Sequence, residues 1–417
     1  MRLPKLDILS PVGLMLAQLF FYIPIKFTII FLGLGKYSLD TFPSFYFAST
    51  LIVLQLIIWL FFFILIYNVK KQKMFKRLAS LQPIEKKKIS IVFSQLLIIS
   101  GLLALFINIY LCGKMPFIHN PIEIKLALDK RPMLTTILSS YASSAIGVAA
   151  YFLFVRHYRE KRSYLIILWL FGVSLLVFML SGSRGAFIGF FLLPLIMVRH
   201  HFYKSISLFL FPILGVLGLA ILAVLDVVRY GGIFSFTYGK FLSLGNLILL
   251  VLDRRFDAYF PNFFFYWENR DLFGFRYGFD YLVAPLQFVP RSFFEEKPYT
   301  LIREINNQLK LQSAGGTGGT SMIEAFANFG VLGLALNGFL GAYIVWIVFS
   351  RFKIAAFRGE AEKFAFWALF GSSLVNTFFI SPGITHSFVS LSVGCFFLKL
   401  FTVAHKIVFS TRENNIY

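Results

Sequence analysis

Long runs of apolar residues recur along almost the whole chain, and the charged residues gather in the stretches between them. A run of about 20 apolar residues is long enough to cross a bilayer as a helix. A helix also satisfies its own backbone hydrogen bonds, which lipid requires of any spanning segment. The runs predict ten spanning helices, near residues 9–32, 43–67, 89–111, 133–155, 163–180, 185–198, 205–228, 322–349, 364–381 and 386–404.

The composition excludes an ordinary soluble domain. Of the 417 residues, 58% are apolar and 14% are charged, and the mean hydropathy is +0.77. Soluble domains are about 45–50% apolar and about 25% charged. In a soluble protein the net charge of +21 would favour a nucleic-acid partner, whereas a membrane protein collects its cations in cytoplasmic loops. We therefore expect an all-α, polytopic transmembrane helix bundle of about ten spans, with a lipid bilayer and no nucleic acid as its partner.

The charges predict the orientation of the chain. Between residues 70 and 88 there are eight Lys and Arg and one Glu, which is typical of a cytoplasmic loop. Both termini are then expected in the cytoplasm. The chain divides into helices one to seven (1–228), a large loop on the opposite side of the membrane (229–321), and helices eight to ten with a cytoplasmic tail (322–417).

The large loop has the composition of a folded region that lies against the bilayer. It contains ten cations and eight anions, so it is not a charged tail. Leu242 to Leu252 is apolar but too short to span the membrane. Tyr259 to Trp267 is rich in aromatic residues, which favour the headgroup level. Thr300 to Leu311 has the pattern of an amphipathic helix, with Ile305 on its apolar face. The loop is therefore expected to contain short interfacial helices that form a lid.

The first candidate motif is Ser181-Gly182-Ser183-Arg184-Gly185, between predicted spans five and six. Ser181, Gly185 and Gly189 repeat every four residues, which is typical of close helix packing. Packing does not account for Arg184, a cation at the membrane surface on the sparsely charged side. A guanidinium group suits bidentate phosphate recognition, so Arg184 is a candidate for binding a phosphorylated substrate.

The second candidate motif is the glycine-rich stretch from Gly315 to Ser321, followed by Glu324 in the first turn of predicted span eight. Ser321 and Glu324 have the spacing of a capping box, in which the carboxylate returns to the helix N-terminus. A carboxylate at this depth in the membrane is also a candidate general base, because a base must be positioned near the proton that it accepts. Both interpretations of Glu324 remain open.

The remaining candidates are cations of the large loop and one histidine. Folded over a membrane cavity, the cations would neutralise a diphosphate without a metal; the alternative is that they pair with the acids around them. His386, at the start of predicted span ten, is a candidate acid, base or ligand, or simply a hydrogen-bonded side chain. No metal-binding motif is present, so we expect neither a metal nor a cofactor. The candidate cations are Arg254, Arg255, Arg276, Arg291 and Lys297.

Taken together, these motifs resemble the O-antigen polymerase family of bacterial lipopolysaccharide assembly, and more distantly the O-antigen ligases. The resemblance rests on the motif that contains Arg184, on Phe288 to Arg291 followed by Lys297-Pro298, and on Gly315 to Gly330. It implies a glycosyltransferase in the bacterial inner membrane that joins polyprenyl-diphosphate-linked oligosaccharide repeat units on the periplasmic face. It also implies a chain-length regulator protein as a partner.

The ligases carry a histidine shortly before the helix that corresponds to span eight, whereas this chain reads Gly318-Gly319-Thr320-Ser321 there. This difference favours a polymerase. A ligase that transfers glycan to the lipid A core, and a flippase or transporter of the lipid-linked oligosaccharide, remain as alternatives.

The polymerase hypothesis assigns a role to each candidate residue. Glu324 is the base, and Arg184 and Arg291 bind the leaving diphosphate. Aromatic side chains such as Tyr259 and Trp267 would stack on sugar faces or form an interfacial belt. The other predicted substrate-binding residues are Arg254, Arg255, Arg276, Lys297, Asn328 and His386.

Overall fold

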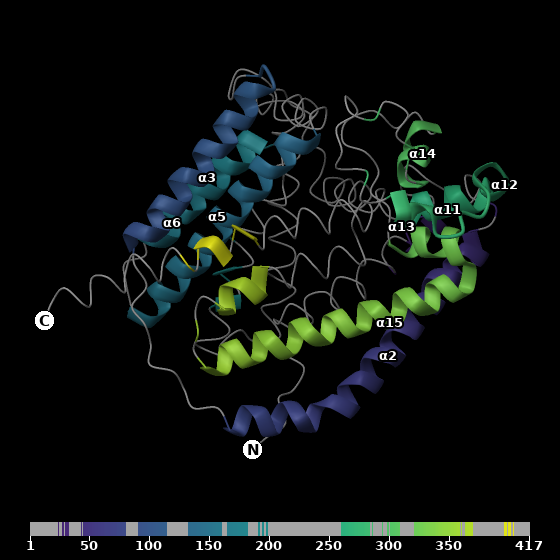
Figure 1. The fold of residues 1–417 in the computed structure, drawn as a ribbon, viewed down its shortest axis with the longest axis horizontal. Coiled ribbons are helices and arrows are strands. Elements are labelled where there is room, and N and C mark those ends of the chain that lie inside the picture. Colours follow the sequence, from purple (N-terminus) through teal and green to yellow (C-terminus); the bar gives the residue numbers. More distant parts are fainter. Residues whose placement is uncertain are drawn as a thin grey trace, which may run out of the picture.

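The computed structural model describes nine helices of four residues or more with defined bounds, and it assigns none of the described residues to a strand (Figure 1). The helices are α2 (Phe45–Ser80), α3 (Ile91–Leu111), α5 (Pro132–Glu160), α6 (Leu165–Ser181), α11 (Phe260–Glu268), α12 (Arg270–Phe273), α13 (Phe279–Val283), α14 (Leu301–Gln308) and α15 (Ser321–Arg358). The structure describes residues 24, 27–28, 30–32, 43, 45–80, 91–114, 132–160, 165–181, 191, 194–195, 197–198, 260–283, 286, 294, 298–299, 301–308, 321–358, 360, 363–369, 396–397, 399–401 and 403.

Four helices in this part of the chain are long and apolar enough to cross a membrane. They confirm helices at four of the predicted spans, and α6 is a shorter apolar helix at a fifth. The chain is therefore a helical membrane protein. The predicted spans 9–32, 185–198, 205–228, 364–381 and 386–404 lie wholly or largely outside the described residues. The four long segments are Phe45–Met74, Ile91–Leu111, Ile137–Tyr158 and Ser321–Arg358.

Helices α3, α5 and α6 pack side by side as one bundle (Figure 1). The helices approach closely at Gly101 of α3, where a Cβ atom would lie 2.7 Å from Ile146 Cγ1 of α5. Asn108 Nδ2 of α3 donates a hydrogen bond to Ser139 Oγ of α5 at 3.0 Å. Small residues and interhelical hydrogen bonds are the usual basis of helix packing in lipid. The opposite face of α3 exposes an apolar stripe that suits contact with acyl chains: Val92, Leu96, Ile99 and Leu103.

The second long pair is α2 and α15, which lie along each other (Figure 1). A Cβ atom at Gly338 of α15 would lie 2.8 Å from Ile58 Cγ2 of α2. Helix α2 continues to Ser80, beyond the predicted end of its span at residue 67. The apolar run ends near residue 67. Because lysine is a good helix former, the helix continues into the basic segment that begins at Lys70. Lys70 Nζ lies 4.5 Å from the centroid of the Tyr343 ring of α15.

Helix α15 is broken at Gly330, where φ is 60° and ψ is −142°. This conformation is accessible to glycine and strongly disfavoured for other residues. The predicted span over 322–349 is confirmed within α15, but the break divides this helix into a first arm, 321–329, and a second arm, 331–358. The arms are packed tightly, because a Cβ atom at Gly333 would overlap the carbonyl oxygen of Ala325.

The short helices α11 to α14 gather at the end of α2 and α15 that contains the first arm (Figure 1). Phe263, Phe264 and Tyr266 of α11 are buried in the core that α2, α14 and α15 share, so these three aromatic side chains are not exposed as an interfacial belt. Trp267 packs on Phe326 of the first arm, with ring centroids 5.5 Å apart. The predicted amphipathic helix over 300–311 is confirmed as α14, and Ile305 is buried as expected.

Candidate functional site

A turn between α12 and α13 positions the central side chain of the candidate site. Gly274, Tyr277 and Gly278 of this turn have φ values of 64°, 49° and 86°. Arg276 lies between them, and its backbone N–H donates a hydrogen bond to the carbonyl oxygen of Ala327 at 2.9 Å. Because α15 is interrupted at Gly330, carbonyl groups near the end of the first arm lack helical partners. The turn therefore satisfies one of them and fixes Arg276 against the first arm.

The guanidinium group of Arg276 is buried and is surrounded by oxygen atoms. Its Nε lies 2.9 Å from Asp280 Oδ2, and its Nη1 donates to Glu304 Oε2 at 2.7 Å. Its Nη2 donates to the carbonyl oxygen of Tyr299 at 3.1 Å. The side chains of Arg276 and Asp280 are only 8% and 3% exposed. Charge-assisted hydrogen bonds in such surroundings are stronger than those between neutral groups.

Asp280 connects three segments of the chain. Its Oδ1 accepts a hydrogen bond from the backbone N–H of Leu301 at 2.8 Å, which ties it to the start of α14. Its Oδ2 accepts from Asn328 Nδ2 at 2.7 Å. The Oδ1 of Asn328 in turn accepts from the backbone N–H of Asp280 at 3.3 Å. The two side chains therefore exchange hydrogen bonds across the contact between α13 and the first arm.

Glu324 lies one turn before Asn328 on the first arm, and its side chain is buried. Asn328 Nδ2 donates a second hydrogen bond, at 2.7 Å, to the backbone carbonyl oxygen of Glu324. Tyr281 of α13 stacks on Phe329, with ring centroids 5.7 Å apart and an interplanar angle of 17°. Burial raises the pKa of the Tyr281 phenol, and the carboxylates of Glu324 and Asp280 raise it further. The phenol therefore remains protonated beside the two acids.

The cluster is acidic. Among the residues that the structure describes, it combines the carboxylates of Asp280, Glu304 and Glu324 with the single guanidinium of Arg276. An acidic, mostly buried site suits proton acceptance and hydrogen bonding to sugar hydroxyls.

Arg276 and Asn328 both have partners within the protein, and their predicted roles in substrate binding stay predictions. The guanidinium of Arg276 contacts two carboxylates and a carbonyl group, so the alternative of pairing with local acids is the one observed. The side-chain oxygen and nitrogen of Asn328 both form hydrogen bonds within the protein.

The structure brings Glu324, Arg276 and Asn328 together, as their common assignment to one site required. The capping role of Glu324 and its catalytic role both remain predictions. The other predicted site residues lie outside the described part of the chain, and their roles likewise stay predictions: Arg184, Arg254, Arg255, Arg291, Lys297 and His386.

Sequence reasoning assigned no role to Asp280, Glu304 or Tyr281. Asp280 follows Arg276 by four residues, a spacing that favours an ion pair on one helical turn. It is also the one acid in the apolar stretch Phe279–Val283. Those two signals identify Asp280 as a buried partner, but neither indicates that Glu304 or Asn328 completes the cluster.

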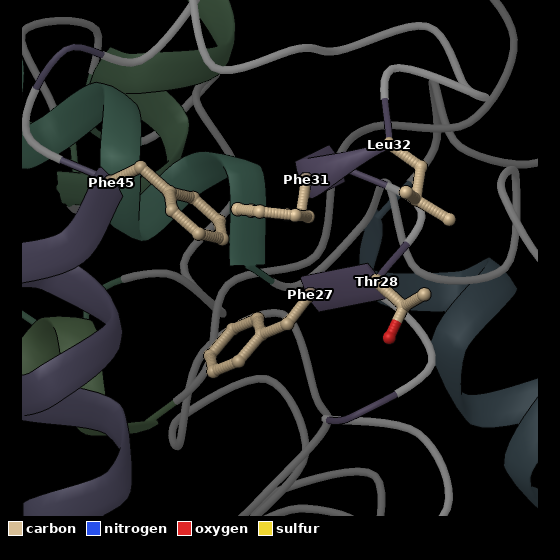
Figure 2. A pocket seen from close by; sticks show the side chains of 5 residues that line it. All are labelled: Phe27, Thr28, Phe31, Leu32 and Phe45. Atoms are coloured by element: carbon tan, nitrogen blue, oxygen red, sulfur yellow. The ribbon is translucent and has the colours of Figure 1, made fainter.

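A separate apolar hollow lies near the start of α2. Figure 2 shows its lining, which consists of Phe27, Thr28, Phe31, Leu32 and Phe45. The Thr28 hydroxyl donates to the carbonyl oxygen of Pro24 at 2.8 Å, so its proton is already used. None of these five described side chains is charged.

In the described ranges, no group of three or more His, Cys, Asp or Glu side chains is arranged to hold a metal ion. No protein-family model, no curated protein and no solved structure matches the chain. The case for function therefore rests on the motifs and on the geometry of the buried cluster.

Proposed function

We propose that the chain is an oligosaccharide repeat unit polymerase, a glycosyltransferase of the O-antigen polymerase type in the bacterial inner membrane. It crosses the membrane about ten times, with both termini in the cytoplasm and with residues 229–321 on the periplasmic side. Its substrates are oligosaccharides linked to polyprenyl diphosphate. A chain-length regulator protein is its proposed partner.

The proposed reaction joins two lipid-linked glycans. The terminal hydroxyl of a single repeat unit attacks the anomeric carbon of the growing glycan. A glycosidic bond forms as the bond from that carbon to the diphosphate oxygen breaks, and polyprenyl diphosphate leaves with the electron pair. The hydroxyl proton passes to the carboxylate of Glu324. A correctly positioned base contributes about 10²–10⁴-fold to such a step.

The observation that carries the proposal is the burial of Glu324 in the first arm of a membrane-spanning helix. Ionisable residues within membrane segments are costly, so a buried acid of this kind is by default a functional candidate. Among the described residues around Glu324, Arg276 is a cation that is already paired with Asp280 and Glu304. Arg184 and Arg291 are assigned to bind the leaving diphosphate. The further substrate contacts are assigned to Arg254, Arg255, Lys297 and His386.

Complementation of a polymerase-deficient strain of the same serotype tests this proposal. We expect the wild-type gene to restore a ladder of glycan lengths on a gel, and Glu324→Gln to leave a single-repeat band, because the amide no longer accepts the proton. Asp271→Asn is the matched control, since the Asp271 side chain is fully exposed on α12. It should restore the full ladder at equal membrane expression.

Each other outcome has a defined meaning. A full ladder from Glu324→Gln would reduce Glu324 to a helix cap. In a ligase-deficient strain, a wild-type gene that restores attachment of glycan to the lipid A core, without elongation in the polymerase-deficient strain, would identify a ligase. Restoration of transport in a flippase-deficient strain, without elongation, would identify a transporter.

A further inference from the structure

The first arm of α15 is attached to α13 and α14 by polar contacts rather than by apolar packing alone. The contacts involve Asp280 and Asn328, which exchange hydrogen bonds at 2.7 and 3.3 Å, and the backbone N–H of Leu301, which donates to Asp280 at 2.8 Å. We call Asp280 and Asn328 the clamp. Both side chains are buried, at 3% and 0% exposure.

The clamp acts directly on the helical turn that carries Glu324. Asn328 Nδ2 donates both to Asp280 and to the carbonyl oxygen of Glu324, each at 2.7 Å. Arg276 supports the clamp from the other side, because its Nε pairs with Asp280 and its backbone N–H binds Ala327. The break at Gly330 gives this arm a direction different from that of the second arm of α15, and the two arms pack against each other at Gly333. The clamp therefore adds directional polar contacts to the apolar packing that holds the first arm against α13.

On the basis of the proposed function, we propose that Asp280 and Asn328 are positioning residues that hold the Glu324 carboxylate in line with the acceptor hydroxyl. They touch neither substrate. Their effect on the reaction passes through Glu324 alone. A displacement of about 1 Å at a reacting group lowers a rate by about 100-fold, so a loosened clamp slows the chemical step without weakening substrate binding.

The test is steady-state kinetics of full-length protein in nanodiscs, with a lipid-linked repeat unit as substrate. We expect Asn328→Ala to lower kcat by about 10- to 100-fold with KM unchanged. Asp280→Asn should also lower kcat. The amide has one oxygen acceptor, whereas the two carboxylate oxygens of Asp280 accept from Leu301 N–H and Asn328 Nδ2. Asn337→Ala is the matched control: Asn337 is buried on the second arm of the same helix and should leave kcat unchanged.

A double variant separates positioning from a general loss of structure. If the clamp acts through Glu324, adding Asn328→Ala to Glu324→Gln should produce no further loss of kcat, because effects of residues that act as a unit are not additive. The proposal would be overturned if the loss of kcat in the double variant equalled the product of the losses in the two single variants. It would also be overturned if kcat were unchanged in both Asn328→Ala and Asp280→Asn.

Amide hydrogen exchange tests the clamp independently of activity. In Asn328→Ala the amide of Asp280 loses its acceptor, so its exchange should accelerate by about fivefold, the equilibrium effect of one hydrogen bond. Unchanged exchange would overturn the clamp even if the wild type polymerises. If the Asp280 amide exchanges faster in Asn328→Ala but the wild-type protein makes no polymer, the clamp stands as a structural feature and the proposed reaction is rejected.

Discussion

Arg276 is a buried cation whose charge is balanced inside the protein. Its partners Asp280 and Glu304 lie 4 and 28 residues after Arg276 in the chain. Asn328, which binds Asp280, lies 48 residues after Asp280. The sequence shows the first of these relationships as an i,i+4 spacing. The others depend on how α14 and the first arm of α15 fold back on α13. For this reason Arg276 could be named as a candidate from the sequence, while Glu304 and the pairings of the cluster could not be predicted.

Removing the guanidinium of Arg276 should destabilise the protein strongly. In Arg276→Ala the buried carboxylate of Asp280 loses its ion-pair partner, and breaking a buried pair in this way costs about 3–5 kcal/mol. The free energy of unfolding, measured by titration with a denaturing detergent in mixed micelles, checks the prediction.

Arg351→Ala provides the control for Arg276→Ala. Arg351 is exposed on the second arm of α15, so the same truncation should change the free energy of unfolding by less than about 0.5 kcal/mol. Equal losses in the two variants would mean that the Arg276 ion pairs do not stabilise the fold.

At the scale of an element, the break in α15 decides where Glu324 lies. Hydropathy predicted a helix here correctly, because Val331 to Phe349 is apolar almost throughout. It did not predict the break, since glycine is common within membrane helices and the chain contains 30 glycines. Only the backbone angles of Gly330 distinguish it from a glycine such as Gly172, which lies within the regular helix α6.

Gly330→Ala should destabilise the protein, because an L-residue is strained at φ 60° and ψ −142°. The expected cost is about 1–3 kcal/mol in the free energy of unfolding. In the complementation assay we also expect a shorter ladder, since the strain tends to redirect the first arm and with it Glu324.

Gly172→Ala is the matched substitution. A Cβ atom at Gly172 meets no neighbour within 4 Å, and alanine is the better helix former, so stability should be equal or slightly higher. If Gly330→Ala is as stable and active as Gly172→Ala, the break does not position the site.

The molecule as a whole is a helical membrane protein with two cores that meet at α15. One core lies among α3, α5 and α6 and includes Phe352, while the other joins α2, α11 and α14 to the first part of α15. Apolar runs predicted the long helices because lipid imposes both their length and their composition. They gave no information on which helices pack together, since small residues and polar contacts decide that.

The proposed orientation predicts which side chains a membrane-impermeant maleimide reaches. In a chain with Cys112 and Cys395 replaced by serine, a cysteine at exposed Asp271 should react in intact spheroplasts. A cysteine at exposed Lys73 should react only after lysis, because the basic end of α2 is assigned to the cytoplasm. The reverse pattern would place the acidic cluster on the cytoplasmic side and contradict the proposed site of polymerisation.

The most direct test of the proposed function is a stoichiometric assay with purified wild-type protein in nanodiscs. A single lipid-linked repeat unit is supplied, and released polyprenyl diphosphate and new glycosidic bonds are counted in the presence of a metal chelator. The proposed reaction predicts one diphosphate released for each bond formed and a ladder of products. In Glu324→Gln, diphosphate release and bond formation should both fall by about 10²–10⁴-fold. Hydrolysis of the substrate without elongation, or no turnover by pure folded protein, would contradict it.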